Sequence, residues 1–287
     1  MRKVDFEKIT LTDDMMFSTV LSEPQRCQEF LQRILGITIV ELEMVTEQKT
    51  MKNKRFGKGI RLDIYVKDQD GNVYDLEMQM TNTKELELRS RYYHSEMDGY
   101  QIKAGQPYNE LKNSIVIFIC DFDMFEKNRS VYTFLNQCVE EKDLILEDKR
   151  KTLFVNISGE RVGLSEELSV LLDYLKTSEP KDEFTKGSDE EVKSVRKDQE
   201  WRDNYMTWEM KLDYEYRMGE KAGIEKGIEK GKVNSIIIIL ENYAPLPEQL
   251  VERIQGITEE EKLTKVLRLA ASATSLEDFE KKFAEVE

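Results

Sequence analysis

The sequence predicts an α/β (α+β) core in its first half, followed by a mostly helical C-terminal region. Three stretches alternate apolar and polar residues with the two-residue period of a half-buried strand, and a long stretch of helical period follows them. A continuous apolar run with β-branched residues comes next, which is typical of a strand buried on both faces. Helix, three strands, helix and strand in this order favour a sheet covered by helices.

Composition excludes several classes of protein. The chain has 287 residues, 39% of them hydrophobic and 35% charged, which is enough for a substantial core. The longer apolar runs, Ile115 to Cys120 and Ile236 to Leu240, are far below the roughly 20 residues that a bilayer requires, so we expect neither a signal peptide nor a membrane span. Three distant cysteines and the single His94 exclude a disulfide framework, a thiolate zinc site and a two-histidine metal site, and they suit a cytoplasmic protein.

The first 80 residues predict two helices and three strands. Residues 10–35 form two short helices that separate at Pro24, with Thr12 as the cap of the first and Gly36 at the end of the second. Alternation with period 2 then predicts strands over 37–50, 61–68 and 73–80.

The next hundred residues predict the rest of the core. A helix covers about 84–104, and the apolar run at 114–123 forms the buried strand. Further strands are expected at 131–138 and 152–158, and a helix at about 165–175.

We therefore expect a domain over residues 1–177 and two further segments. Residues 178–200 are polar and form a charged linker or a solvated helix, and residues 201–287 are helical and end in a small bundle. Glycines recur every four residues in the Gly-Ile-Glu-Lys repeat, at positions 219, 223, 227 and 231. Glycine weakens an isolated helix, so either a partner helix packs there and makes a homo-oligomer, or the segment is a frayed linker.

The charge distribution gives two opposing indications about nucleic acid. A net charge of −14 disfavours a polyanionic partner. Between Lys49 and Arg61, however, six basic residues occur without an acidic one, just before the strand that carries Asp63. This basic segment is either a phosphate-binding element or a flexible solvated loop, and it has no aromatic residues interleaved in a way that would suggest base readout.

The strands at 61–68 and 73–80 predict a hairpin with two opposed carboxylates. A three-residue loop over 69–71, with Gly71 in the left-handed region, is a common hairpin geometry. In that register Asp63 lies opposite Glu77, with Cβ atoms about 5 Å apart on one face. A two-residue turn would mix the apolar and charged faces, so the pattern favours the first register.

Two carboxylates at this separation repel one another. A divalent cation such as Mg²⁺ removes the repulsion and leaves room for water and phosphate, as in metal-assisted phosphodiester hydrolysis. The alternative is a solvated sheet face on which both groups are paired with Lys67 or Arg61.

The helix at 84–104 places an arginine beside its apolar stripe. Tyr93 belongs to the stripe, and Arg89 lies within about 60° of its centre. A guanidinium in this position requires a partner, either the acidic hairpin or a bound phosphate, unless it extends off the helix edge into solvent.

Five motifs, taken in order, resemble the recombination-promoting nuclease (Rpn) and transposase family of bacteria, within the PD-(D/E)XK nuclease superfamily. They are DDMMF (13–17), RLDIYV (61–66), DLEMQ (75–79), RSRYYHSEM (89–97) and GQPYNELKNSIVIFICDFDMF (105–125). The resemblance covers roughly residues 10–160.

The resemblance implies a restriction-endonuclease-like core with a central mixed sheet and DNA cleavage that uses Mg²⁺ or Mn²⁺. Asp63 and Glu77 would be the metal ligands, and Gln79 stands where the superfamily usually has a water-activating lysine. Asp14 matches an N-terminal acid of the family, although it could equally be a carboxylate favoured at a helix start.

The same resemblance, with the basic segment, implies a set of nucleic-acid-binding residues. They are Arg89, Tyr93, Lys52, Lys54, Arg55, Lys58 and Arg61.

Two functions follow from these observations. The first is a metal-dependent DNA endonuclease of low sequence specificity that acts in recombination or transposition. The second is a catalytically weak or inactive form of the same fold that serves as a DNA- or protein-binding module, which the acidic net charge and the absent lysine favour.

Overall fold

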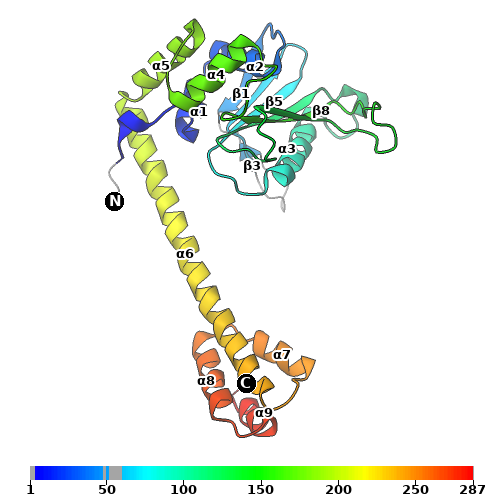
Figure 1. Ribbon diagram of the computed structural model, residues 1–287, viewed down its shortest axis with the longest axis vertical. Coiled ribbons are helices and arrows are strands. Elements are labelled where there is room, and N and C mark those ends of the chain that lie inside the picture. Colours follow the sequence, from blue (N-terminus) through cyan, green and yellow to red (C-terminus); the bar gives the residue numbers. More distant parts are fainter. Residues whose placement is uncertain (1–3, 48–49, 52–59, 287) are drawn as a thin grey trace. The chain divides into compact units, whose positions relative to one another are not determined.

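The computed structural model describes residues 4–47, 50–51 and 60–286. A six-stranded mixed sheet with flanking helices forms the larger part of the chain, and helices alone form the rest (Figure 1). The predicted α/β fold with a restriction-endonuclease-like mixed sheet and a helical C-terminal region is confirmed.

Two helices open the chain after a short 3₁₀ turn, η1 (Phe6–Lys8). Helix α1 (Asp14–Val20) is capped by Asp13, whose carboxylate accepts a bond from Met16 N, so Thr12 was the wrong cap by one residue. Helix α2 (Pro24–Leu35) begins with proline at its first position and ends at Gly36 in the left-handed conformation, as predicted.

The central sheet has the order β1-β4-β5-β6-β8-β7. Strands β1, β4 and β5 are antiparallel neighbours, β5, β6 and β8 run parallel, and β7 closes the far edge antiparallel to β8. Their bounds are β1 (Leu42–Glu47), β4 (Ile64–Asp68), β5 (Val73–Gln79), β6 (Ser114–Cys120), β7 (Val131–Phe134) and β8 (Arg150–Asn156). Every residue of β6 is buried, in agreement with its continuous apolar sequence.

A separate ribbon pairs β2 (Thr50–Met51) with β3 (Ile60–Arg61). The predicted strand at 61–68 is therefore divided between β3 and β4, and the predicted strand at 37–50 is shorter, with a bulge between Met44 and Thr46.

Helices cover both faces of the sheet (Figure 1). Helix α3 (Leu86–Gln101) connects β5 to β6 and packs on one face, where Leu86, Tyr93 and Met97 meet Val116 and Phe118 of β6. Helices α2 and α4 (Glu166–Thr177) cover the other face, and a second 3₁₀ turn, η2 (Tyr108–Glu110), precedes β6.

Residues 178–200, expected as a linker or a solvated helix, contain a packed helix. Helix α5 (Glu183–Val195) has a complete capping box at Asp182 and Thr185, and it lies against α1, α2 and α4. Its buried residues are Phe184, Thr185, Ser188, Val192 and Val195. The apolar positions are few but share one face, which is enough for docking.

Contacts divide the chain into one unit of residues 1–205 and another of residues 206–287. Helix α6 (Gln199–Glu241) begins in the first unit, where Trp201 and Tyr205 are buried beside Phe6. Trp201 Nε1 donates to Thr19 Oγ1 at 3.0 Å and the Tyr205 hydroxyl donates to Asp13 Oδ2 at 2.8 Å, which fixes the start of α6 on α1.

The glycine repeat lies inside α6, which is continuous, so the frayed linker is wrong for this segment. The side chains are exposed from residue 210 to residue 228, and a Cβ atom added at any of the four glycines would meet nothing within 4 Å.

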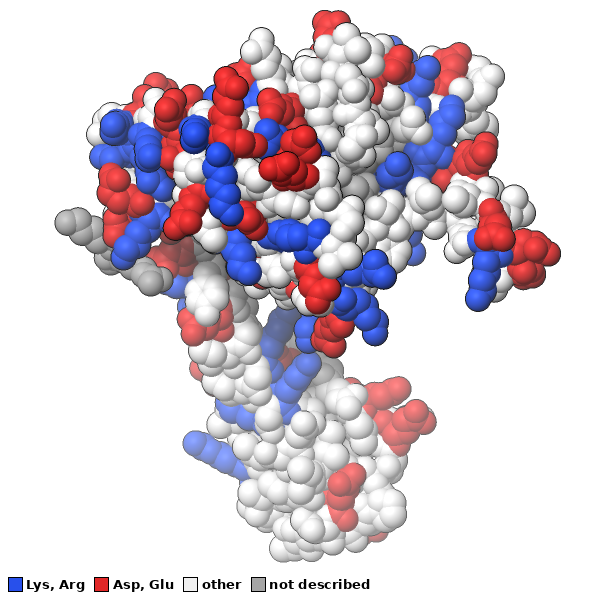
Figure 2. Space-filling view, turned by 45° about the horizontal axis from the view of Figure 1, so that its top comes forward, with Lys and Arg blue, Asp and Glu red and all other residues white. Residues whose placement is uncertain are grey.

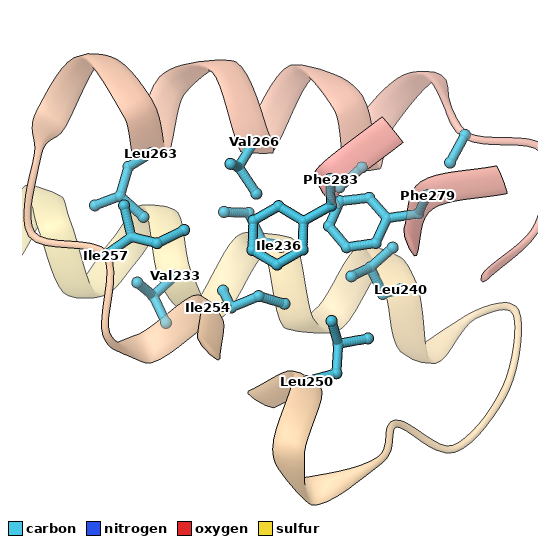
Figure 3. Packing of buried hydrophobic residues seen from close by; sticks show 12 residues of the cluster. Val233, Ile236, Leu240, Leu250, Ile254, Ile257, Leu263, Val266, Phe279 and Phe283 are labelled. Carbon is cyan, nitrogen blue, oxygen red and sulfur yellow. The ribbon is translucent and has the colours of Figure 1, made fainter. Parts of the chain in front are cut away.

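The second unit has a core of its own. The end of α6 packs with α7 (Glu248–Gln255), α8 (Glu260–Ser272) and α9 (Leu276–Ala284), which confirms the expected small bundle. Figure 3 shows Phe279 and Phe283 directed toward Ile236 and Leu240 in the middle of this core. No helix among the described residues is long and apolar enough to cross a membrane.

Candidate active site

The hairpin of β4 and β5 has the predicted register. Ile64 pairs with Leu76 and Val66 with Tyr74, and Gly71 in the connecting loop has φ +85°. Continuing this register by one position sets Asp63 opposite Glu77, at the point where β4 ends and β5 extends further.

The carboxylates of Asp63 and Glu77 each accept a hydrogen bond from a backbone N–H on the opposite side of the hairpin. Asp63 N donates to Glu77 Oε1 at 3.2 Å, and Met78 N donates to Asp63 Oδ2 at 3.3 Å. Each carboxylate therefore takes the place of a backbone carbonyl as the acceptor at the end of the β4–β5 pairing. These bonds hold both acidic groups on the side of the sheet that α3 covers.

Arg89 of α3 reaches this pair from above the sheet. Its Nη2 donates to Glu77 Oε2 at 2.8 Å and its Nη1 donates to Gln79 Oε1 at 2.9 Å. The Tyr93 hydroxyl accepts from Nε and Nη2 of the same guanidinium, at 3.1 and 2.7 Å. The arginine beside the apolar stripe thus has the acidic hairpin as its partner, and Gln79 and Tyr93 hold it in place.

A third carboxyl, Asp75, lies in the same row of β5. Asp75, Glu77 and Gln79 occupy every second position of β5 and therefore share the face that α3 covers. Asp75 pairs with Tyr65 across the hairpin. Its side chain is completely buried, and neither carboxyl oxygen has a hydrogen-bond partner. The sequence did not single out Asp75, because an acidic residue at every second position of a strand is equally typical of a solvated sheet face.

Burial and repulsion between carboxyls raise the pKa values of Glu77 and Asp75. Desolvation raises the pKa of Glu77 well above its usual value, Asp75 and Asp63 raise it further, and Arg89 opposes them. Desolvation likewise raises the pKa of Asp75, with Asp63 adding to the effect and Arg89 opposing it. Groups arranged in this way are typical of functional sites, because an ion of opposite charge relieves the repulsion.

The carboxyl groups fit a hard divalent cation by their chemistry, since all are oxygen donors and one is buried without a partner. Within the described part of the chain, no three Asp, Glu, His or Cys side chains already converge as metal ligands do. Asp14 is exposed at the first position of α1, a helix that contacts β5, and it does not complete such a group.

The basic segment falls mostly outside the described residues. Lys52, Lys54, Arg55 and Lys58 belong to that part, and of Arg61 only the backbone, in β3, is described. On the face drawn in Figure 2, acidic and basic side chains are interspersed over the residues of the larger unit.

His94 is a structural residue of the core. It is 1% exposed, and its ring nitrogens lie 2.7 Å from Ser114 Oγ and 3.0 Å from Thr152 Oγ1. Desolvation lowers its pKa to about 4, so the ring is neutral at neutral pH.

Comparison with known proteins gives one family. No curated protein and no solved structure matches the chain. A model of the PD-(D/E)XK nuclease family transposases matches residues 13–229, which include α1, the whole sheet, the acidic hairpin and Arg89. The match spans well over half of the chain, and the protein belongs to this family of nucleases associated with transposition.

Proposed function

We propose that this protein is a divalent-metal-dependent DNA endonuclease that hydrolyses phosphodiester bonds with little sequence preference, in transposition or recombination. The observation that carries the proposal is the opposition of Asp63 and Glu77 at the end of the β4–β5 ladder, with Arg89 and Gln79 beside them. Membership in a nuclease family supports this reading of the carboxylates.

In this proposal Asp63 and Glu77 hold Mg²⁺ or Mn²⁺. A cation bound there would polarise the phosphate and stabilise the negative charge that develops on it. Gln79 replaces the lysine of the superfamily, and its amide can orient a water by hydrogen bonding without adding positive charge.

Arg89 supplies a positive charge close to the carboxylates. Its guanidinium is bonded to Glu77, Gln79 and Tyr93, so its first task is to hold these groups in place. Because Arg89 is 28% exposed, we assign it a phosphate contact as well, and we assign the basic segment from Lys52 to Arg61 the sequence-independent contacts with the DNA backbone. Asp14, at the start of α1, is assigned a supporting role in orienting water.

Plasmid nicking tests the proposal. The wild type should nick supercoiled DNA with Mg²⁺ or Mn²⁺ and lose nicking in EDTA. Asp63→Asn and Glu77→Gln should each reduce the rate by at least about a hundredfold, since each removes a charged group from the site. Asp70→Asn and Glu87→Gln make the same changes at exposed positions and should leave nicking unchanged.

The second candidate is a binding module without catalysis, favoured by the absence of the lysine and by the bonds that already occupy Arg89. DNA binding in a fluorescence anisotropy assay, with no nicking in any divalent metal, would establish this function and exclude the first.

Self-association through α6 is a further part of the proposal. Apolar side chains are exposed along the helix within residues 210–228, among them Leu212, Tyr216 and Ile224. A second copy that packs against this stretch would cover them. Sedimentation equilibrium should then show a dimer or larger species, and a monomer at all concentrations would exclude it.

A further inference from the structure

Asp75 is a buried carboxyl without the hydrogen bonds that buried carboxyls usually have. It is 0% exposed and both of its oxygens lack a hydrogen-bond partner. An unpaired polar group in this state lowers the stability of the folded protein, and more so if it is charged. A native structure seldom retains such a cost without a use for the group.

The same hairpin satisfies another buried carboxyl completely. Asp68 is 7% exposed and accepts four bonds, from Asp70 N, Asn72 N, Asn72 Nδ2 and the Tyr74 hydroxyl, at 2.8 to 2.9 Å. Asp68 organises the turn through these bonds. Asp75, seven residues further along, has no such bond among the described residues, so its carboxyl does not stabilise the turn or the sheet by hydrogen bonding.

The neighbours of Asp75 in the sheet give its carboxyl no hydrogen bond. Tyr65 lies across the hairpin and Val116 lies on the neighbouring parallel strand. Asp75 lies two positions before Glu77 on the same face of β5, and Asp63 and Arg89 are the charged groups that act on it. Its carboxyl therefore belongs to the site by its place in the strand.

The acidic groups of the site outnumber its basic group. Asp63, Asp75 and Glu77 are carboxyls on the α3 side of the sheet, and Arg89 is bonded to one of them, Glu77. A divalent cation has the charge that would compensate for such an excess of acidic groups.

We infer that Asp75 is a third carboxylate of the cation site, which raises the affinity of the Asp63–Glu77 pair for a divalent ion by supplying negative charge beneath it. This inference rests on the proposed function. It concerns the charge of Asp75, because no three potential ligands already converge within the described residues.

The test measures cation binding without DNA. Mn²⁺ is titrated into the full-length protein, and its affinity is followed by calorimetry and by the shift in melting temperature. Asp75→Asn keeps the size of the side chain and removes the charge. It should lower the affinity for Mn²⁺ by at least about tenfold, since a buried charge this close interacts strongly with a dication.

The metal-free protein should respond in the opposite direction. Asp75→Asn relieves the repulsion among the carboxyls, so its melting temperature in EDTA should be at or above that of the wild type, whereas saturating Mn²⁺ should stabilise it less. A residue needed only for packing would not give this reversal.

Asp68→Asn is the matched control. It makes the same change at a buried carboxyl of the same hairpin that is fully hydrogen-bonded, and it should lower stability while leaving the affinity for Mn²⁺ unchanged. Asp75→Val, which suits a fully buried strand position, serves as a second variant in case the asparagine variant does not fold.

The outcomes separate this inference from the proposed function. Loss of Mn²⁺ binding in Asp63→Asn and Glu77→Gln together with wild-type affinity in both Asp75 variants would overturn the inference and leave the proposed site intact. A wild type that binds no divalent ion would overturn both.

Discussion

Arg89 shows how one side chain unites the candidate active site. It joins two side chains of β5, Glu77 and Gln79, to Tyr93 of its own helix through four hydrogen bonds. Glu77 is nearly inaccessible to solvent, with its side chain 2% exposed. Removing the arginine would therefore leave a buried carboxylate without a counter-charge, which is the costly way to break an ion pair.

We predict that Arg89→Leu lowers the free energy of unfolding by about 3 kcal/mol or more. Adding Glu77→Gln to that variant should restore at least half of the loss, because the uncompensated charge is gone. Urea unfolding of the two single variants and the double variant measures this coupling. Arg91→Leu, at an exposed position of the same helix, should change stability by less than about 0.5 kcal/mol; an equal loss in both arginine variants would contradict the role of the ion pair.

His94 makes the free energy of unfolding depend on pH, and the direction of its pKa shift gives the sign of that dependence. Its folded pKa is lowered to about 4 from an ordinary value of 6.5, so the unfolded chain takes up a proton between these values and the native protein does not. The His94 contribution to stability is therefore complete above pH 6.5 and falls as the pH decreases toward 4, by about 3 kcal/mol in total.

His94→Gln should abolish this part of the pH dependence. The difference in unfolding free energy between wild type and variant, measured in urea at pH 7 and at pH 4.5, should shrink by about 2 kcal/mol at the lower pH. His94 is the single histidine of the chain, so no other imidazole contributes. Parallel curves for the two proteins would show that the native imidazole is not protected from protonation.

At the scale of elements, glycine has opposite roles in the hairpin and in α6. Gly71 has φ +85° in the turn, where an added Cβ would also lie 3.3 Å from Cγ of Lys112. Gly223 and Gly227 have ordinary helical backbone and open space around them. The same substitution should therefore have opposite effects at the two places.

We predict that Gly223→Ala with Gly227→Ala raises helix stability by up to about 1 kcal/mol per site, whereas Gly71→Ala destabilises the protein by about 1 kcal/mol or more. Thermal unfolding followed by circular dichroism at low protein concentration measures both. Destabilisation by the α6 substitutions would mean that a partner packs closely on the glycines, and sedimentation of the same samples would then show a change of mass.

The sequence predicted those elements whose signals are local. Alternation on both strands and Gly71 were sufficient for the hairpin register, and Pro24 and Gly36 marked the ends of α2. Helix α5 was not recognised as packed because its apolar residues are sparse, and their burial depends on contacts with α1, α2 and α4. The continuity of α6 arises because strong helix formers surround each glycine and offset its cost.

The types of residue in the candidate site could be predicted from the sequence, whereas the burial of each side chain could not. Opposition of Asp63 and Glu77 followed from the register, whereas the helix pattern gave the hairpin as only one of three possible partners of Arg89. The state of Asp75 could not be read from the chain, because it depends on how completely α3 and the neighbouring strands cover it.

At the scale of the whole molecule, each of the two units has its own core. The larger unit buries the sheet against helices on both faces, and the smaller one buries twelve residues among four helical segments. Helix α6 contributes Trp201 and Tyr205 to the first unit and Ile236 and Leu240 to the second. Separate cores imply that the two units can unfold separately.

We predict that residues 206–287, expressed alone, form a helical domain that unfolds cooperatively. Phe279→Ala should destabilise this fragment by about 3–5 kcal/mol, since it removes a fully buried ring from the core. Ile238→Ala, at a position 63% exposed, should have little effect. Circular dichroism in urea measures both, and a fragment without cooperative unfolding would show that this core requires the rest of the chain.

The three-residue loop between β4 and β5 helps to set which side chains share a face of the hairpin. A slip of the pairing by one position would turn the side chains of one strand to the opposite face, so that Leu62 or Ile64 would take the place of Asp63 beside Glu77. A change in the loop that moves the pairing would therefore separate the two carboxylates, whereas one that only lengthens the turn would leave them opposed.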